Sequence, residues 1–325
     1  MNENLEIQAD GLTKSYGGVR VLNGVGLRVP AGTVFALLGP NGAGKTTIVR
    51  ILATLTAPEG GTARVAGHDV VAECGAVRRR ISLTGQYAAI DELQTGRENL
   101  EMMGRLRRLR KRAARARATE LLERFDLTEA ADRRVSGYSG GMRRRLDLAA
   151  GLVGTPKVIF LDEPTTALDP RSRQAMWDVV TDMADSGVTV FLTTQYLDEA
   201  DRLADTIAVL DRGRIVAEGS ARELKQRVGG ARLDLQTTDV AAFDEVIWAL
   251  GDRAVQFDRA ALTLGVATED SAARARALFD EIDPDGTLIA RFELRTASLD
   301  DVFLSVTGGH VHEPVPVPES EIAHV

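Results

Sequence analysis

Apolar and polar residues follow two different periods along the first two thirds of the chain. Around residues 5–9 and 25–29 every second residue is apolar, which predicts two half-buried strands. Residues 34–38 and 158–161 are continuous apolar runs and 188–193 is nearly so, as expected for strands buried on both faces. The intervals are expected to hold strands over 62–71 and 78–84 and helices over 47–55, 97–109, 113–125 and from residue 139. This alternation predicts an α/β fold with a mostly parallel sheet and a helical subdomain at about residues 87–155.

The pattern changes near residues 229–230. The order that follows is strand from 232, helix 240–250, strands 254–257 and 262–266, helix 271–282 and strand 287–294. This βαββαβ order predicts a small ferredoxin-like α+β domain. Ser298 and Asp301 have the spacing of a capping box, which would open a last helix over 299–306. We therefore expect one domain over 1–229, a second over 230–308, and a disordered tail over 309–325, where prolines gather without periodicity.

A glycine-rich turn joins the apolar run 34–38 to the next helix. Its residues are Gly39, Pro40, Asn41, Gly42, Ala43, Gly44, Lys45, Thr46 and Thr47, in the order G-x-x-x-x-G-K-[ST] of a phosphate-binding loop. We expect the glycines to allow backbone angles that let successive N–H groups surround a phosphate, at a helix N-terminus that also attracts anions. Lys45 would contact the β- and γ-phosphates, and the Thr46 hydroxyl would ligate Mg²⁺. The chain is predicted to bind a nucleoside triphosphate.

Two carboxylates follow the apolar run 158–161. Asp162 and Glu163 lie at the carboxyl end of a strand, where open α/β sheets bind their ligands. Asp162 is expected to hold Mg²⁺, and Glu163 to act as general base on the attacking water. A solvated acidic turn would be the simpler interpretation of the pair in a chain without a phosphate loop.

Ser139, Gly140 and Gly141 open a predicted helix. Either they are an ordinary N-cap, or their free N–H groups and the helix dipole form a second anion site. One nucleotide needs only one phosphate cradle, so a second predicts a nucleotide held between two subunits.

Composition and charge narrow the classes of function. A net charge of −7 and a pI near 5.3 argue against a general nucleic-acid binder. The single cysteine, Cys74, excludes an intramolecular disulfide. The first ten residues show no signal peptide, and no apolar run approaches the roughly 18 residues that span a bilayer. Work at a membrane would therefore need a separate spanning partner.

Residues 5–225 resemble the nucleotide-binding domain of an ABC (ATP-binding cassette) transporter, a P-loop NTPase. The resemblance implies ATP and Mg²⁺ as ligands, with Gln86 reaching Mg²⁺, Asp169 in the D-loop, and Tyr16 stacking on adenine, unless Tyr16 only packs on the sheet. It also implies a head-to-tail homodimer, in which Ser139, Gly140 and Gly141 act on the partner's nucleotide. One position departs: Gln195 stands where the family usually has a histidine. Glutamine can donate a hydrogen bond to the γ-phosphate but cannot carry a proton.

The segments YSGGMRRRLDLA and TTQYLDEAD and residues 298–304 resemble the daunorubicin-resistance type of drug-export ATPase. The resemblance implies an ATPase subunit at the cytoplasmic face of the cell membrane that drives efflux of a drug, antibiotic or lipid-like molecule through a separate permease. The alternative is a soluble ABC ATPase whose nucleotide-gated dimerisation regulates a process other than transport. For the C-terminal domain we expect dimer stabilisation or regulation.

Residues 105–117 contain eight basic residues in thirteen. Because the apolar residues between them keep near-helical spacing, a solvated helix face is the simpler interpretation, and contact with anionic lipid headgroups is the alternative. No aromatic residues interleave with the run, which disfavours nucleic acid.

Overall fold

The computed structural model describes residues 4–85, 90–166, 168–228, 231–268 and 272–307. The chain divides into two compact units, the first ending at Glu218 and the second beginning at Gly219, ahead of the change of pattern at 229–230. The glutamine expected to reach Mg²⁺, Gln86, and the tail over 309–325 lie outside the described residues.

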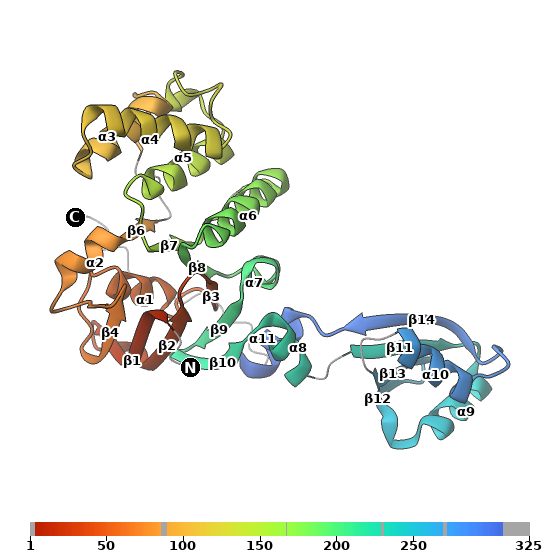
Figure 1. Ribbon diagram of the computed structural model, residues 1–325. Helices are drawn as coiled ribbons and strands as arrows, with labels where there is room; N and C mark the ends of the chain where they lie inside the picture. The colour runs from red at the N-terminus through yellow and green to blue at the C-terminus, as the bar shows by residue number, and fades with distance from the viewer. Residues whose placement is uncertain (1–3, 86–89, 167, 229–230, 269–271, 308–325) are drawn as a thin grey trace. The chain divides into compact units, whose positions relative to one another are not determined.

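The first unit contains two sheets (Figure 1). An antiparallel sheet has the order β2-β1-β4-β5, and a larger sheet has the order β10-β9-β3-β8-β7-β6. The antiparallel strands are β1 (Leu5–Tyr16), β2 (Val19–Pro30), β4 (Gly60–Val65) and β5 (His68–Asp69). The larger sheet is built from β3 (Val34–Leu38), β6 (Ile81–Thr84), β7 (Val158–Asp162), β8 (Thr189–Thr194), β9 (Thr206–Asp211) and β10 (Arg214–Gly219). The pairings of β9, β3, β8, β7 and β6 are parallel, as the sequence predicted.

Two groups of helices accompany these sheets. The first consists of α1 (Lys45–Leu52), α2 (Cys74–Arg80), α6 (Pro170–Asp185) and α7 (Leu197–Leu203). The second is a separate lobe of α3 (Gly96–Leu106), α4 (Lys111–Arg124) and α5 (Gly140–Leu152), drawn above the sheets in Figure 1. This lobe lies in the interval where the sequence predicted a helical insertion.

The strand expected over 78–84 is wrong in its first half. Residues 74–80 form α2, and only 81–84 form β6. Val77 is the buried residue of α2, while three arginines occupy its last turn, where positive charge favours a helix. The strand therefore begins only at Ile81.

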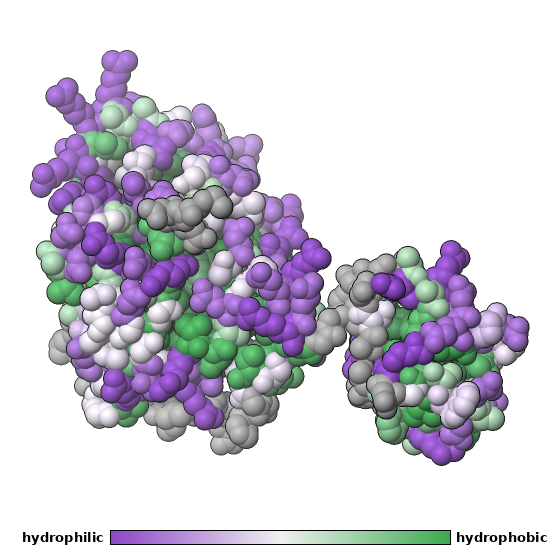
Figure 2. Space-filling view, turned by 60° about the horizontal axis from the view of Figure 1, so that its bottom comes forward, coloured by the Kyte–Doolittle hydropathy of each residue, from purple (hydrophilic) through white to green (hydrophobic). Residues whose placement is uncertain are grey.

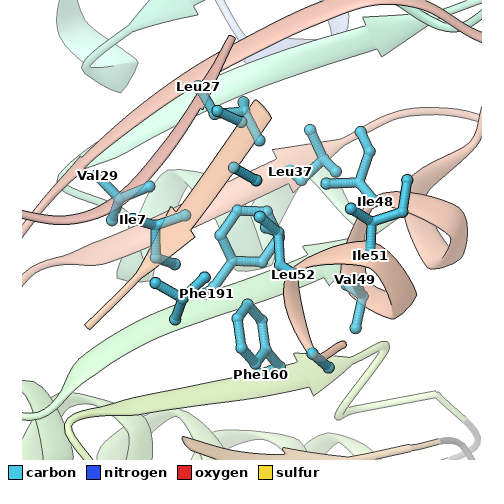
Figure 3. Close-up of a cluster of buried hydrophobic side chains, with 14 of the residues drawn as sticks. Ile7, Leu27, Val29, Leu37, Ile48, Val49, Ile51, Leu52, Phe160 and Phe191 are labelled. Carbon is cyan, nitrogen blue, oxygen red and sulfur yellow. The ribbon is translucent and has the colours of Figure 1, made fainter. Parts of the chain in front are cut away.

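The core of the first unit lies where α1 packs between the two sheets (Figure 3). Ile7 and Val29 come from the antiparallel sheet, and Ile51 from α1. Phe160 and Phe191 come from β7 and β8, and their ring centroids lie 5.7 Å apart. Because β3 and β7 are buried on both faces, their positions in the sheet are fixed. The phosphate loop after β3 and Glu163 after β7 therefore start from fixed positions.

The second unit confirms the predicted βαββαβ order. Its elements are β11 (Ala231–Thr237), α9 (Val240–Leu250), β12 (Ala254–Asp258), β13 (Thr263–Thr268), α10 (Ala272–Ile282) and β14 (Ile289–Thr296). The antiparallel sheet has the order β12-β13-β11-β14, and its apolar side packs against α9 and α10. In the same unit α8 (Ala221–Arg227) packs against α11 (Leu299–Thr307), the last helix that the capping box predicted.

Candidate functional site: a phosphate loop beside two carboxylates

The phosphate loop connects β3, whose residues are all buried, to α1. Gly42 and Gly44 have φ values of 79° and 110°, in the left-handed region that favours glycine. An added Cβ on Gly44 would also lie 2.8 Å from a methyl carbon of Leu22. Gly39 differs from our expectation, because its φ is not positive. It is required instead because a Cβ there would collide with the carbonyl oxygen of Leu210.

Lys45 is the first residue of α1, and its side chain is only 5% exposed. Its Nζ donates to the carbonyl oxygens of Gly39, at 2.7 Å, and Pro40, at 3.2 Å. The same Nζ lies 3.6 Å from Glu163 Oε1. Burial lowers the pKa of Lys45, and the carboxylates of Glu163 and Asp162 oppose that shift. The loop thus holds one ammonium group beside the two carboxylates that the sequence placed at the end of β7.

Asp162 and Thr46 come together as predicted. The Thr46 hydroxyl lies 3.1 Å from Asp162 Oδ2, although the two residues are 116 positions apart in the sequence. The Thr193 hydroxyl at the end of β8 donates to Asp162 Oδ1 at 2.5 Å. A hydroxyl and a carboxylate are the hard oxygen ligands that Mg²⁺ prefers, so this pair fits the ion.

Glu163 lies directly after β7 and has a φ of 51°, which a residue with a side chain adopts only at a cost. Its backbone N–H donates to the Thr193 carbonyl oxygen at 3.1 Å and to the Thr193 hydroxyl at 3.2 Å. This turn directs the Glu163 carboxylate toward Lys45. The sequence did not identify Thr193, whose role depends on the pairing of β7 with β8.

Gln195 and Tyr16 lie at element ends. Gln195 is exposed and directly follows β8, whose last residue Thr194 is opposite Leu38, the residue before the phosphate loop. Tyr16 ends β1, is 44% exposed, and has the Lys14 ammonium 5.5 Å from its ring centroid. Its open ring face is available for stacking.

The signature residues lie at the start of α5, and two of them, Ser139 and Gly140, face outward. The Ser139 hydroxyl accepts the Met142 N–H at 3.3 Å, which leaves Gly140 and Gly141 to present the first free amides of the helix. Ser139 and Gly140 are exposed, and a Cβ on Gly140 would meet nothing within 4 Å. Within the described part of the chain, no hydrogen bond or ion pair joins these residues to Lys45 or the Asp162–Glu163 pair.

Asp169 caps α6. It accepts the Ser172 N–H at 3.0 Å and the Ser172 hydroxyl at 2.6 Å, and these bonds lower the pKa of Asp169. The Ser172 hydroxyl would be 2.6 Å from a Cβ added to Gly141. The D-loop and the signature helix therefore touch through Ser172.

Arg144 of α5 is a site residue that the sequence did not distinguish from its neighbours. Its buried guanidinium donates to the carbonyl oxygen of Pro164 at 3.0 Å and to that of Gly85 at 2.7 Å, and it pairs with Asp147 at 3.5 Å. Burial lowers the pKa of Arg144. One side chain thus ties the signature helix to the ends of β7 and β6.

A buried acid, Glu199 of α7, lies behind the same region. It accepts the indole N–H of Trp177 at 3.2 Å, and burial raises the pKa of Glu199. Glu199 belongs to the segment TTQYLDEAD, which the sequence analysis singled out. The burial of its side chain becomes visible only in the packing of α7 against α6.

Comparison with known proteins agrees with this geometry. Residues 22–166 match the family described as ABC transporter, and residues 219–307 match the C-terminal domain of ATP-binding proteins like DrrA1-3. The chain is 52% identical to a daunorubicin/doxorubicin resistance ATP-binding protein of Streptomyces peucetius, over 93% of this chain and 92% of the relative. It is 47% identical to a doxorubicin resistance ATP-binding protein of Mycobacterium tuberculosis, over 94% of this chain and 95% of the relative.

A solved structure also resembles the first unit. It is a dimeric ATP-binding cassette in a post-hydrolysis state with ADP and phosphate, at a TM-score of 0.59 and 25% identity. The match covers 66% of this chain and 98% of that one. The phosphate loop, the Asp162–Glu163 pair and these relatives together show that the chain belongs to the ABC-transporter ATP-binding proteins of the daunorubicin/doxorubicin-resistance family.

Proposed function

We propose that this chain is the ATP-hydrolysing subunit of a drug exporter and works as a head-to-tail homodimer with two ATP molecules at its interface. Each site would take its phosphate loop and Glu163 from one subunit and residues 139–141 from the other. The observation that carries the proposal is the convergence of Lys45, Thr46, Asp162 and Glu163 at one edge of the sheet. Ser139 and Gly140 are exposed and, in the described part of the chain, have no bond to that cluster, which supports a second subunit completing the site.

The residues divide the chemistry among them. Glu163 accepts the proton of the water that attacks the γ-phosphorus in line. Lys45 and the N-terminus of the partner's α5 stabilise the negative charge that develops on the phosphate oxygens. Mg²⁺, held by Thr46 and Asp162, would neutralise charge on the β- and γ-phosphates. Tyr16 would stack on the adenine ring.

Export is inferred from the relatives, whose names record resistance to daunorubicin and doxorubicin. No described helix is long and apolar enough to cross a membrane. We therefore propose a separate permease that carries the drug and holds this subunit at the cytoplasmic face of the membrane. ATP-driven daunorubicin uptake into inside-out vesicles that contain both proteins would support this role. Hydrolysis that no drug or permease alters would favour the alternative, a regulatory ATPase.

The Glu163→Gln variant tests both the ATP-dependent dimer and the role of Glu163 as general base. Removing the general base should lower the steady-state rate of ATP hydrolysis by about 10²–10⁴-fold. The variant should still bind ATP and elute as a dimer in ATP and Mg²⁺, while it elutes as a monomer without nucleotide. A variant that hydrolyses ATP at the wild-type rate would remove Glu163 from the mechanism.

Gln195 is proposed to sense the γ-phosphate. Its amide can donate one hydrogen bond to a phosphate oxygen, so Gln195→Ala should lower the rate of hydrolysis by about 10-fold, the value of one such bond. The affinity for ADP, which lacks the γ-phosphate, should stay unchanged and serves as the control. Hydrolysis at the wild-type rate would rule the role out.

The second unit is proposed to stabilise the dimer or to regulate it. The side of its sheet away from α9 and α10 carries rows of charge: Arg232 lies opposite Arg295, and Asp234 lies opposite Glu293. Within the subunit Asp234 already pairs with Arg232, at 2.5 Å, and with Arg295, at 3.4 Å, so a two-fold axis between the rows would join these ion pairs into a network across the interface. If Asp234→Arg leaves the monomer–dimer equilibrium in ATP unchanged, this side of the sheet has no part in dimerisation.

A further inference from the structure

The turn between α3 and α4 closes one end of the helical lobe. Helix α3 ends at Leu106 and α4 begins at Lys111. The two helices approach closely here, because an added Cβ on Gly104 would lie only 2.8 Å from the Cβ of Ala114. Arg108 completes the turn with a φ of 64°. The basic run is therefore not one continuous helix face but the tip of a tight helical hairpin, in the lobe seen above the sheets in Figure 1.

Part of the basic run serves the fold. Arg107 donates to the carbonyl oxygens of Arg78 and Ile81 at 3.3 Å each. Arg117 donates to the carbonyl oxygen of Leu152 at 2.8 Å and pairs with Glu120. Arg107 thus ties the lobe to α2 and β6, and Arg117 ties α4 to α5 within the lobe, so the charges of both residues are already committed.

Five other basic residues form what we call the basic tip: Arg105, Arg108, Arg110, Lys111 and Arg112. All five are exposed, and in the described ranges none has a hydrogen bond or ion pair to another side chain. The neighbouring Arg115 forms a long ion pair with Glu101, in which Arg115 Nε lies 4.0 Å from Glu101 Oε1. Figure 2 shows that the surface of the helical lobe is largely hydrophilic. The chain as a whole carries a net charge of −7, so the concentration of positive charge is local.

An apolar residue lies among these charges. Leu106 is 70% exposed at the end of α3, within the basic tip. A cluster of exposed cations around an exposed leucine matches an anionic bilayer surface, where phosphates attract the cations and the leucine enters the interface. Nucleic acid fits less well, because residues 105–117 contain no aromatic side chain for stacking on bases.

We propose that the basic tip binds anionic lipid headgroups directly. The contact goes beyond the proposed function, because it needs neither ATP nor a permease. It would orient the helical lobe on the membrane surface and strengthen the placement that a permease gives. The two proposals can fail separately, since lipid binding is measured here without hydrolysis or transport.

The experiment measures flotation of the full-length chain with vesicles of neutral phosphatidylcholine, and with vesicles that contain about one third phosphatidylglycerol, at about 0.15 M salt. The wild type should bind the anionic vesicles and leave the neutral ones. The test variant is Arg110→Glu/Lys111→Glu/Arg112→Glu, at the N-cap and the first two residues of α4, where acidic side chains suit the helix N-terminus and so preserve the helix. Losing three cations should weaken binding about 100-fold or more.

The matched control is Arg79→Glu/Arg222→Glu/Arg276→Glu, which changes the net charge equally at exposed positions elsewhere. It should bind vesicles nearly as the wild type does. Equal loss in both triple variants would assign binding to net charge and overturn the proposal. Binding by the test variant at the wild-type level would overturn it as well. A short DNA duplex that displaces the anionic vesicles at comparable concentration would assign the tip to nucleic acid instead. Unchanged thermal unfolding of the test variant is the control for folding.

Discussion

The phosphate-loop half of the proposed site and its signature half are built in opposite ways. In the first, Lys45 is 5% exposed and contacts Glu163, and Asp162 is held by the hydroxyls of Thr46 and Thr193. In the second, Ser139 and Gly140 are exposed at a helix N-terminus, with open space beside Gly140. A buried constellation finds its partners within its own fold, whereas the first amides of a helix are held in place by the helix but acquire a partner only when something docks on them. The difference is what the proposed dimer requires, because one half of the proposed site is complete within the chain and the other half is presented outward.

The strongest way to test this contrast compares two neighbouring glycines. Gly140→Ala adds a methyl group that meets nothing in this chain, but that would crowd an anion seated on the first amides of α5. We expect hydrolysis to fall by about 10²-fold, with stability within about 0.5 kcal/mol of the wild type. Thermal unfolding and steady-state hydrolysis measure the two effects.

Gly141→Ala is the matched variant. Its methyl group would lie 2.6 Å from the Ser172 hydroxyl and 3.0 Å from Ser172 Cβ, so it should destabilise the first unit by about 1–3 kcal/mol through overpacking. If instead Gly140→Ala hydrolyses ATP at the wild-type rate, the outward presentation of α5 has no part in catalysis.

Arg144 links the two halves, and its removal should have a smaller effect on the rate. Arg144→Met loses the bonds to the carbonyl oxygens of Pro164 and Gly85 while keeping much of the side-chain volume. ATP affinity should remain within about 2-fold and hydrolysis should fall about 10-fold, because position rather than binding is lost.

Arg145→Met is the control for Arg144, since Arg145 lies on the same helix and, among the described residues, its side chain pairs with the exposed Asp126 alone. It should leave the hydrolysis rate near that of the wild type. If Arg144→Met lowers ATP affinity and the rate of hydrolysis by the same factor, Arg144 supports the fold and does not position the catalytic groups.

The smallest expected effect concerns Glu199 and pH. Burial raises the pKa of the Glu199 carboxyl in the folded chain above its unfolded pKa, which is near 4.5. Glu199 therefore contributes all of its stabilisation at pH values below the unfolded pKa, and this stabilisation is lost as the pH rises through the folded pKa. Glu199→Gln keeps an oxygen to accept the Trp177 N–H and removes the titration. The melting temperature of the variant relative to the wild type should therefore be higher at about pH 8 than at about pH 5, by about 2–4 °C. A difference that does not change with pH would contradict this assignment.

Much of the fold followed from patterns that act locally. Apolar runs identified β3 and β7, and the βαββαβ order of the second unit was predicted from periodicity alone. The first half of the strand expected at 78–84 was wrong, because three arginines at the end of α2 give no sign in sequence of whether Val77 packs from a helix or a strand. Short segments are ambiguous until a tertiary surface receives one of their faces.

The sequence by itself determined the chemistry: a glycine-rich loop with Lys45 and Thr46, the acids Asp162 and Glu163, and a signature helix opened by Ser139. Those groups are specified by residue type and spacing, because backbone amides and an ammonium group suit phosphate, while a hydroxyl and carboxylates suit Mg²⁺ or the attacking water, wherever the strand and helix order places them. Only the tertiary structure decided what holds them. The partners Thr193, Arg144 and the Leu210 carbonyl come from strands and helices distant in the chain, and such contacts depend on sheet order and packing rather than on local pattern. The same holds for the basic tip, where the hairpin decides which charges serve the fold and which remain exposed.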